Sequence, residues 1–161
     1  MYAIDSRDRV IEIDIAPTPS TGAPEPLLLA DDHAVALRYV TAESDRQTMD
    51  SGIQLAIVRF GSWAHYFGPP NDEAVSGHPL YERGLRPYGV FEVQHSSWIR
   101  LMELRNRVHD RHAPERFAQL RHFIITFHDS TFECVAKSVM ARTVPEKDAD
   151  AIWATILKSK R

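Results

Sequence analysis

Short segments in which apolar and polar residues alternate recur along the chain and predict β-strands. Every second residue from 11 to 15 is isoleucine and the two between them are acidic, as in a strand with one buried face. Residues 27–30 and 35–40 are mainly apolar and flank an Asp-Asp-His sequence, which predicts a hairpin. Residues 53–60 are apolar enough for a central strand, and residues 90–94 predict one more.

The strongest hairpin signal lies on either side of Asp129-Ser130, where two alternating segments meet. A loop of two or four residues keeps the same side chains on one face, whereas an odd loop length would break this inference. The apolar face is expected to carry Phe123, Ile125, Phe127, Phe132, Cys134 and Ala136. The other, non-core face is expected to carry Thr126, His128, Thr131 and Glu133.

Helical spacing appears in three places. A helix is expected to begin after His95-Ser96-Ser97, where a serine hydroxyl supplies the cap, and to end near Val108. A shorter helix is expected to begin at Pro114. The sequence Thr143-Val144-Pro145-Glu146 has the form of a capping box and predicts the start of a C-terminal helix. The apolar stripe of that helix is Ala149, Ile152, Trp153, Ile156 and Leu157.

The order of these elements predicts an α+β fold, because helices do not alternate regularly with strands. We expect a mainly antiparallel sheet of about six to seven strands with two to three helices, including the C-terminal amphipathic helix. The length of 161 residues fits a single globular domain over residues 1–161. Residues 16–26 contain four prolines and predict a loop or tether, and residues 61–88 predict a long irregular region, although strand alternation can continue to Phe67.

Composition narrows the functional classes. The formal net charge of −3 gives no overall electrostatic case for a nucleic-acid partner. No stretch approaches the roughly 18 consecutive apolar residues of a membrane helix, so no membrane partner is expected. The single cysteine, Cys134, permits no intramolecular disulfide, and a cytoplasmic location is the default expectation.

Residues 60–98 hold eight of the fifteen aromatic residues and five of the seven glycines, together with histidines and the polar loop Asn71-Asp72-Glu73. Such a mixture is typical of a pocket wall built from loops on a rigid scaffold. We therefore predict a small-ligand pocket in this region. Its expected lining is Trp63, His65, Tyr66, Asn71, His78, Tyr81 and Arg83.

Histidine, present eight times, is the side chain that moves protons near neutral pH. His128 stands beside the turn residue Asp129 and shares the predicted non-core face with Glu133, so these three are the catalytic candidates. Hydrolysis or another proton-transfer reaction is the expected chemistry, because no activated nucleophile is evident. The alternative interpretation of this face is a solvated, polar cross-strand cluster.

Signatures of phosphate loops, dinucleotide-binding turns, zinc proteases and serine hydrolases are absent from the sequence. Four residues around the Pro-Pro turn could supply nitrogen and oxygen ligands to a metal, namely His65, Asp72, Glu73 and His78. The favoured explanation of these residues is a strand histidine, a polar turn and a histidine bonded to the backbone. We assign no metal and no cofactor.

Two further functions are compatible with the sequence. The aromatic and arginine-rich residues 81–88 favour a non-catalytic interaction or inhibitor module that docks a partner protein. The six arginines between Arg100 and Arg121 are the basis of a weaker alternative, a nucleic-acid accessory protein. The expected partner is therefore a small molecule or another protein, and a homodimer is compatible with either.

Overall fold

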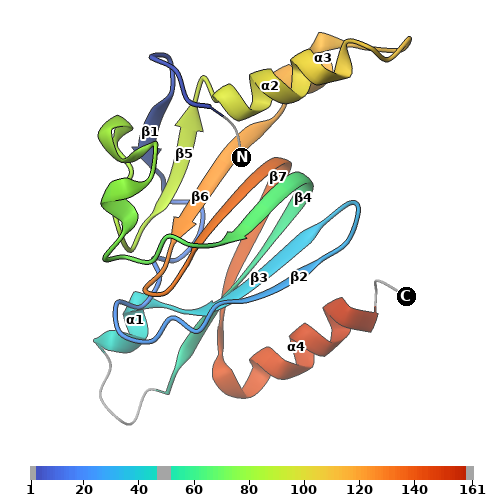
Figure 1. Ribbon diagram of the computed structural model, residues 1–161. Helices are drawn as coiled ribbons and strands as arrows, with labels where there is room; N and C mark the ends of the chain where they lie inside the picture. Colours follow the sequence, from blue (N-terminus) through green and yellow to red (C-terminus); the bar gives the residue numbers. More distant parts are fainter. Residues whose placement is uncertain (1–2, 47–51, 159–161) are drawn as a thin grey trace.

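A single antiparallel sheet of seven strands forms the body of the computed structural model, which describes residues 3–46 and 52–158 (Figure 1). The strands are β1 (Arg9–Glu12), β2 (Leu27–Ala30), β3 (Val35–Val40), β4 (Gln54–Gly68), β5 (Val90–Gln94), β6 (Arg121–Thr126) and β7 (Thr131–Pro145). Their order across the sheet is β1-β5-β6-β7-β4-β3-β2. The predicted α+β class with a mainly antiparallel sheet is confirmed.

Four α-helices accompany the sheet within the described residues: α1 (Ala42–Asp45), α2 (Ser97–Asn106), α3 (Pro114–Ala118) and α4 (Glu146–Lys158). The Ser96 hydroxyl caps α2 by accepting the Ile99 N–H, and Pro114 occupies the first turn of α3, as the sequence predicts. None of these helices is both long enough and apolar enough to cross a membrane.

The start of α4 differs from the prediction. Thr143 lies in β7 and pairs with Ala56, so it is a strand residue rather than the first member of a capping box, and the helix begins at Glu146. The ladder between β4 and β7 continues to Pro145, and this non-local pairing determines the conformation of the segment. The apolar stripe is confirmed for Ala149 and Ile156, which are buried, and for two partly buried residues, Ile152 and Trp153. The side chain of Leu157 is outside the described part of the chain.

The predicted apolar face of the β6–β7 hairpin is confirmed. The backbone N–H of Phe127 donates to the Ser130 carbonyl at 2.8 Å, so the loop contains two residues, His128 and Asp129. This even loop length keeps the expected side chains together in one buried core cluster, which includes Phe123, Ile125, Phe127, Phe132, Cys134 and Ala136.

The opposite face of the hairpin is buried, which corrects its interpretation as a solvated, non-core face. Helices α2 and α3 and the 3-10 turns η1 (Val75–Gly77) and η2 (Tyr81–Arg83) pack on the β1, β5, β6 and β7 half of the sheet, while α4 packs on the β3 and β4 half (Figure 1). Thr126, Thr131 and Glu133 are consequently enclosed. The alternation of residues identifies which side chains share a face, but not which distant segments cover it.

The irregular segment between β4 and β5 is fixed against the hairpin. Strand β4 runs to Gly68, so this segment spans residues 69–89 rather than beginning at residue 61. The Thr131 hydroxyl donates to the Pro70 carbonyl at 2.9 Å, and the Thr126 hydroxyl donates to the Arg86 carbonyl at 2.9 Å. Two buried threonines of the hairpin therefore hold both ends of the segment.

The proline-rich residues 16–26 lie against the end of β3. The Ser20 N–H donates to the Val40 carbonyl at 2.8 Å, and the Val40 N–H donates to the Pro24 carbonyl at 2.7 Å. The buried Tyr39 hydroxyl also donates to the Pro17 carbonyl at 2.6 Å. The segment connects β1 and β2, the two edge strands of the sheet, and packs Ala16 into the main core cluster.

Candidate functional site

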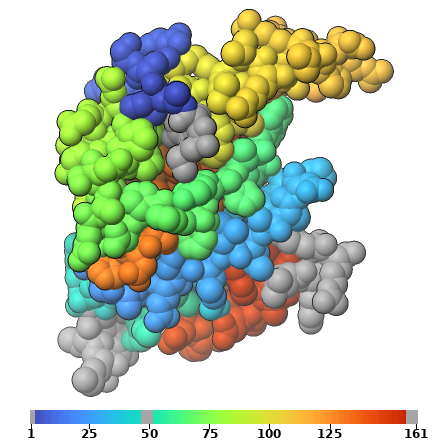
Figure 2. Space-filling view, in the orientation of Figure 1, coloured from blue at the N-terminus to red at the C-terminus, as the bar shows by residue number. Residues whose placement is uncertain are grey.

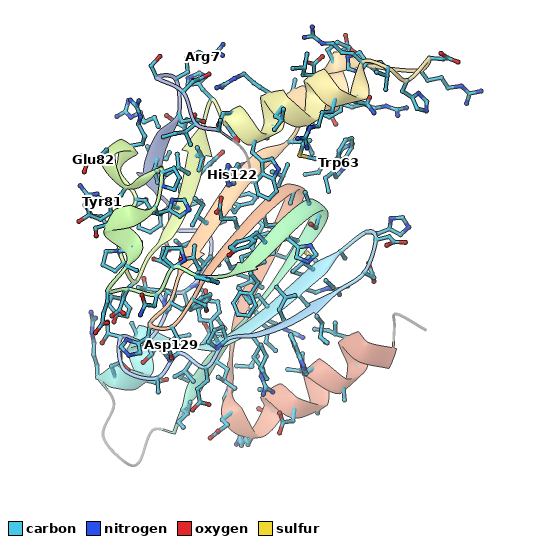
Figure 3. The ribbon with its side chains drawn as sticks, in the orientation of Figure 1. Arg7, Trp63, Tyr81, Glu82, His122 and Asp129 are labelled. Carbon is cyan, nitrogen blue, oxygen red and sulfur yellow. The ribbon has the colours of Figure 1, made fainter. Side chains whose placement is uncertain are left out.

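The residues expected to line one pocket lie in different parts of the molecule. Trp63 is on β4 beside α3, with its ring centroid 5.4 Å from that of Phe117. Tyr81 and Arg83 are in η2, and Tyr81 packs with residues of β1 and β5. Figure 3 shows Trp63 and Tyr81 on opposite sides of the view, with His122 between them. These residues therefore do not form a common wall.

Three other members of the expected lining serve local roles or are exposed. The Tyr66 hydroxyl donates to the Pro69 carbonyl at 3.0 Å. The Asn71 side-chain oxygen accepts the Ala74 N–H at 3.0 Å, which makes Asn71 a turn residue. His65 is exposed on β4, opposite Cys134 in the ladder.

The remaining member, His78, meets the catalytic candidate Glu133 in the interior. His78 Nε2 lies 3.2 Å from Glu133 Oε1, and His122 Nε2 lies 3.0 Å from Glu133 Oε2. The Ser96 hydroxyl lies 2.9 Å from His122 Nδ1. We call His78, Ser96, His122 and Glu133 the inner cluster; all four residues are buried, and Glu133 and His122 have no exposed surface.

Hydrogen bonding assigns the protons in the inner cluster. The Leu80 N–H donates to His78 Nδ1 at 3.2 Å, so the His78 proton is on Nε2 and faces Glu133. Ser96 Oγ already accepts the Ile99 N–H, which leaves its hydroxyl proton to donate to His122 Nδ1. Both imidazoles therefore donate to the Glu133 carboxylate, one to each oxygen, which is how a buried carboxylate is accommodated.

The inner cluster joins segments that are far apart in sequence. It links η1 and the turn after it, the N-terminus of α2, and strands β6 and β7. Ser96, which the sequence suggests only as a helix cap, and His122 were not among the predicted site residues. The sequence did contain a signal for His122. It lies two residues before Ile124 on the same strand and therefore on the same face of the sheet, and Ile124 pairs directly with Glu133 in the ladder.

A second group of polar side chains lies at the turn between β6 and β7. The Tyr88 hydroxyl donates to Asp72 Oδ2 and lies 2.9 Å from His128 Nδ1, which is 3.2 Å from the same Asp72 oxygen. The Tyr88 and His128 rings stack with a 17° interplanar angle. The Asp72 N–H also donates to the His128 carbonyl at 2.9 Å. We call Asp72, Tyr88 and His128 the outer cluster.

The shared carboxylate perturbs both of its partners in the outer cluster. The Tyr88 hydrogen bond holds the pKa of Asp72 below its ordinary value. The same hydrogen bond, with some desolvation, raises the pKa of Tyr88 to about 12. Tyr88 also has a left-handed backbone, with φ of 56°, which is uncommon for an aromatic residue and is maintained by the surrounding contacts.

The three catalytic candidates are thus divided between the two clusters. His128 belongs to the outer cluster, where Asp72 takes the place expected for Glu133, and Glu133 belongs to the inner cluster. Asp129 is exposed in the turn and has no hydrogen bond within the described residues (Figure 3). The considered metal ligands are similarly dispersed, and within the described part of the chain no group of three or more His, Cys, Asp or Glu side chains is arranged so that it could hold a metal ion.

Because of its contacts in the outer cluster, Tyr88 is expected to ionise at a higher pH than an ordinary tyrosine. Since the raised pKa favours the protonated phenol, Tyr88 stabilises the folded state below its ordinary pKa of 10.0, and this contribution is lost as the pH rises towards about 12. Near-ultraviolet absorbance titration of the parent protein and Tyr88→Phe should differ by one phenol that ionises near pH 12. Loss of a phenol that ionises near pH 10 would contradict the Asp72 hydrogen bond. The buried Tyr39, whose pKa is also raised, remains in both proteins.

Comparisons of the chain with protein-family models, with curated proteins and with solved structures found no match.

Proposed function

We propose that the outer cluster is a general acid–base site and that the protein is an enzyme of hydrolysis or another proton-transfer reaction, with His128 as the base. The observation that carries the proposal is the arrangement of His128: Nδ1 is held by Tyr88 and Asp72, whereas no described residue hydrogen-bonds Nε2. The His128 side chain is 44% exposed, so a substrate can reach it.

The hydrogen bonds favour the tautomer that a base requires. Because Tyr88 donates its own proton to Asp72, the Nδ1–H of His128 is the donor towards Tyr88 Oη and Asp72 Oδ2. The unprotonated nitrogen is then Nε2, which can accept a proton from a bound water or hydroxyl group. The Asp72 carboxylate stabilises the imidazolium that forms, as an aspartate does in hydrolase triads.

Charge around the outer cluster favours a neutral or cationic substrate. Glu73 and Asp129 are both exposed and their charges contribute to the raised pKa of Tyr88, so both act on the same region. An anionic group approaching His128 would meet the charges of three carboxylates, including Asp72. This argues against phosphate esters and favours ester or amide substrates without negative charge.

The test is hydrolysis of a panel of neutral and cationic p-nitrophenyl esters and anilides. His128→Gln and Asp72→Asn should each reduce turnover by about 10²- to 10⁴-fold, the usual range for a general base. The matched control is His109→Gln, which removes an exposed histidine from the connection between α2 and α3 and should leave turnover unchanged. Turnover that persists in His128→Gln, or no turnover of any substrate in the panel, would overturn the proposal.

The proposal implies a small-molecule partner and requires no nucleophilic cysteine. Burial raises the pKa of the Cys134 thiol to about 12, so it is a poor nucleophile. A cytoplasmic location is part of the proposal and is supported by the lack of a second cysteine in the sequence.

The aromatic and arginine-rich loop, residues 81–88, supports a protein-docking role less strongly in the structure than it does in the sequence. The Arg86 guanidinium lies 4.7 Å from the Tyr81 ring centroid and donates to the Tyr81 and Leu85 carbonyls. Arg86 is therefore engaged in holding its own loop together, and it offers less to a partner than the sequence implied.

A further inference from the structure

We propose that a shallow groove beside Trp63 binds a neutral sugar ring, independently of the acid–base site. The groove has a volume of about 500 Å³ and lies between β4, β7 and the β2–β3 turn. In Figure 2 the surface is indented between the projecting α2–α3 arm and the β2–β3 turn. A flat aromatic side chain, a cation, a carboxylate, an imidazole and hydroxyl groups all face this one hollow.

An irregularity in β4 creates the floor of the groove. The register between β4 and β7 shifts on both sides of Ser62, so that Trp63 is an extra residue between the pairs Ser62–Ala136 and Ala64–Val135. Gly61 lies just before it, and a side chain there would place its Cβ 2.8 Å from Ser138 Oγ. The bulge presents Trp63 to the surface, and the glycine keeps the adjoining space open.

Trp63 is held in position but is not covered. Its ring meets the Phe117 ring at 76°, which fixes its orientation against α3. The residue is nevertheless 42% exposed, which is high for the largest apolar side chain. A fixed, exposed indole is suited to stacking against the apolar C–H face of a sugar ring.

The polar side chains around the indole are available to a ligand. Asp32, His33, Lys137 and Ser138 line the groove, and none of their side chains makes a hydrogen bond or ion pair within the described residues. The Lys137 ammonium lies 5.8 Å from the Trp63 ring centroid. These groups provide both donors and acceptors at the edge of a stacking surface, as the hydroxyl groups of a sugar require.

Charge distinguishes a sugar from other ring-shaped ligands. Asp32 and Lys137 carry opposite charges, so the groove as a whole favours neither an anion nor a cation. A nucleotide or an aromatic carboxylate would leave Asp32 facing a negative ligand. A neutral, hydroxyl-rich ring can use both side chains, one as acceptor and the other as donor.

The test is a titration with neutral glucose, galactose and mannose oligosaccharides, alongside adenosine monophosphate and benzoate as anionic planar ligands. The readout is the NMR signal of the Trp63 indole N–H, one of three tryptophan signals, assigned by its loss in Trp63→Phe. At least one oligosaccharide should shift this signal. Isothermal titration calorimetry, which does not depend on the Trp63 signal, should show that the affinity for this oligosaccharide falls at least tenfold in Trp63→Ala and less in Trp63→Phe, which keeps an aromatic ring.

The matched control is Trp153→Ala. Trp153 is also partly buried and also lies near a cation, with the Arg38 guanidinium 5.6 Å from its ring, but it is on α4. This variant, and His128→Gln at the acid–base site, should bind the oligosaccharide as the parent does. Failure of every oligosaccharide, a response to the anionic ligands alone, or binding that Trp63→Ala retains would each overturn the proposal, whatever the outcome for catalysis.

Discussion

Replacing Glu133 with alanine is expected to lower the free energy of unfolding by about 3–5 kcal/mol. The carboxylate accepts N–H groups from His78 and His122 in a region without solvent. Its removal leaves both donors unsatisfied, at about 1–3 kcal/mol for each buried group, and opens a cavity between the hairpin and its cover. Urea denaturation followed by circular dichroism measures the change.

Two variants separate the network from a general effect of losing a glutamate. Glu82→Ala removes an exposed glutamate of η2 and should alter stability by less than about 0.5 kcal/mol. Glu133→Gln should be intermediate, because its amide oxygen can accept from one imidazole while its NH₂ group faces the other donor. If Glu133→Ala had the same midpoint of urea unfolding as the parent protein, the inner cluster would not be stabilising the fold.

The parts of the fold that depend on local periodicity could be predicted from the sequence. The alternation from Phe123 to Ala136 identified the apolar face of the hairpin, because any loop with an even number of residues keeps the same side chains on one face. Thr143 shows the limit of this reasoning. Its sequence context favours a helix cap, but the partner strand β4 extends to Gln54 and keeps Thr143 in the ladder. A pairing partner about ninety residues away is not visible in a local pattern.

Individual residues of the candidate site could be predicted from the sequence, but which of them lie together could not. His128, Glu133 and His78 were each identifiable from chemistry and spacing. That His128 meets Asp72, and Glu133 meets His78, depends on how residues 69–89 fold back over the hairpin. This segment has no periodicity, so sequence patterns cannot position it.

Trp63 illustrates a second physical limit. Period-two alternation assigns Trp63 and His65 to the same side of a regular strand. The register shift at Ser62 adds a residue at Trp63, and the indole packs against α3 instead. Bulges are determined by the pairing of two strands, so the alternation of one strand alone does not reveal them.

Both clusters depend on the same irregular segment being seated correctly. The inner cluster holds residues 69–89 through His78, and the outer cluster holds them through Asp72 and Tyr88. Between these points, η2 packs closely against β1: a Cβ on Gly84 would lie 2.6 Å from the Val10 carbonyl oxygen. The closeness of this approach makes Gly84 the most direct probe of the segment.

Gly84→Ala is therefore expected to lower the free energy of unfolding by about 2–4 kcal/mol. Two costs combine: Gly84 has φ of 117°, a backbone conformation that alanine rarely adopts, and the added methyl group meets backbone that cannot rotate away. Thermal and urea unfolding measure the loss, and hydrogen exchange should show its largest increase in η2 and at the start of β5.

Gly77→Ala is the matched control in the same segment, because its backbone is not left-handed and an added Cβ would have nothing within 4 Å. It should be neutral or stabilise by up to about 1 kcal/mol through the unfolded chain. Equal stability of the two variants would mean that η2 is not seated on β1. If Gly84→Ala alone is destabilised, and if His128-dependent turnover falls with it while Gly77→Ala keeps full turnover, then the same segment supports both the fold and the outer cluster.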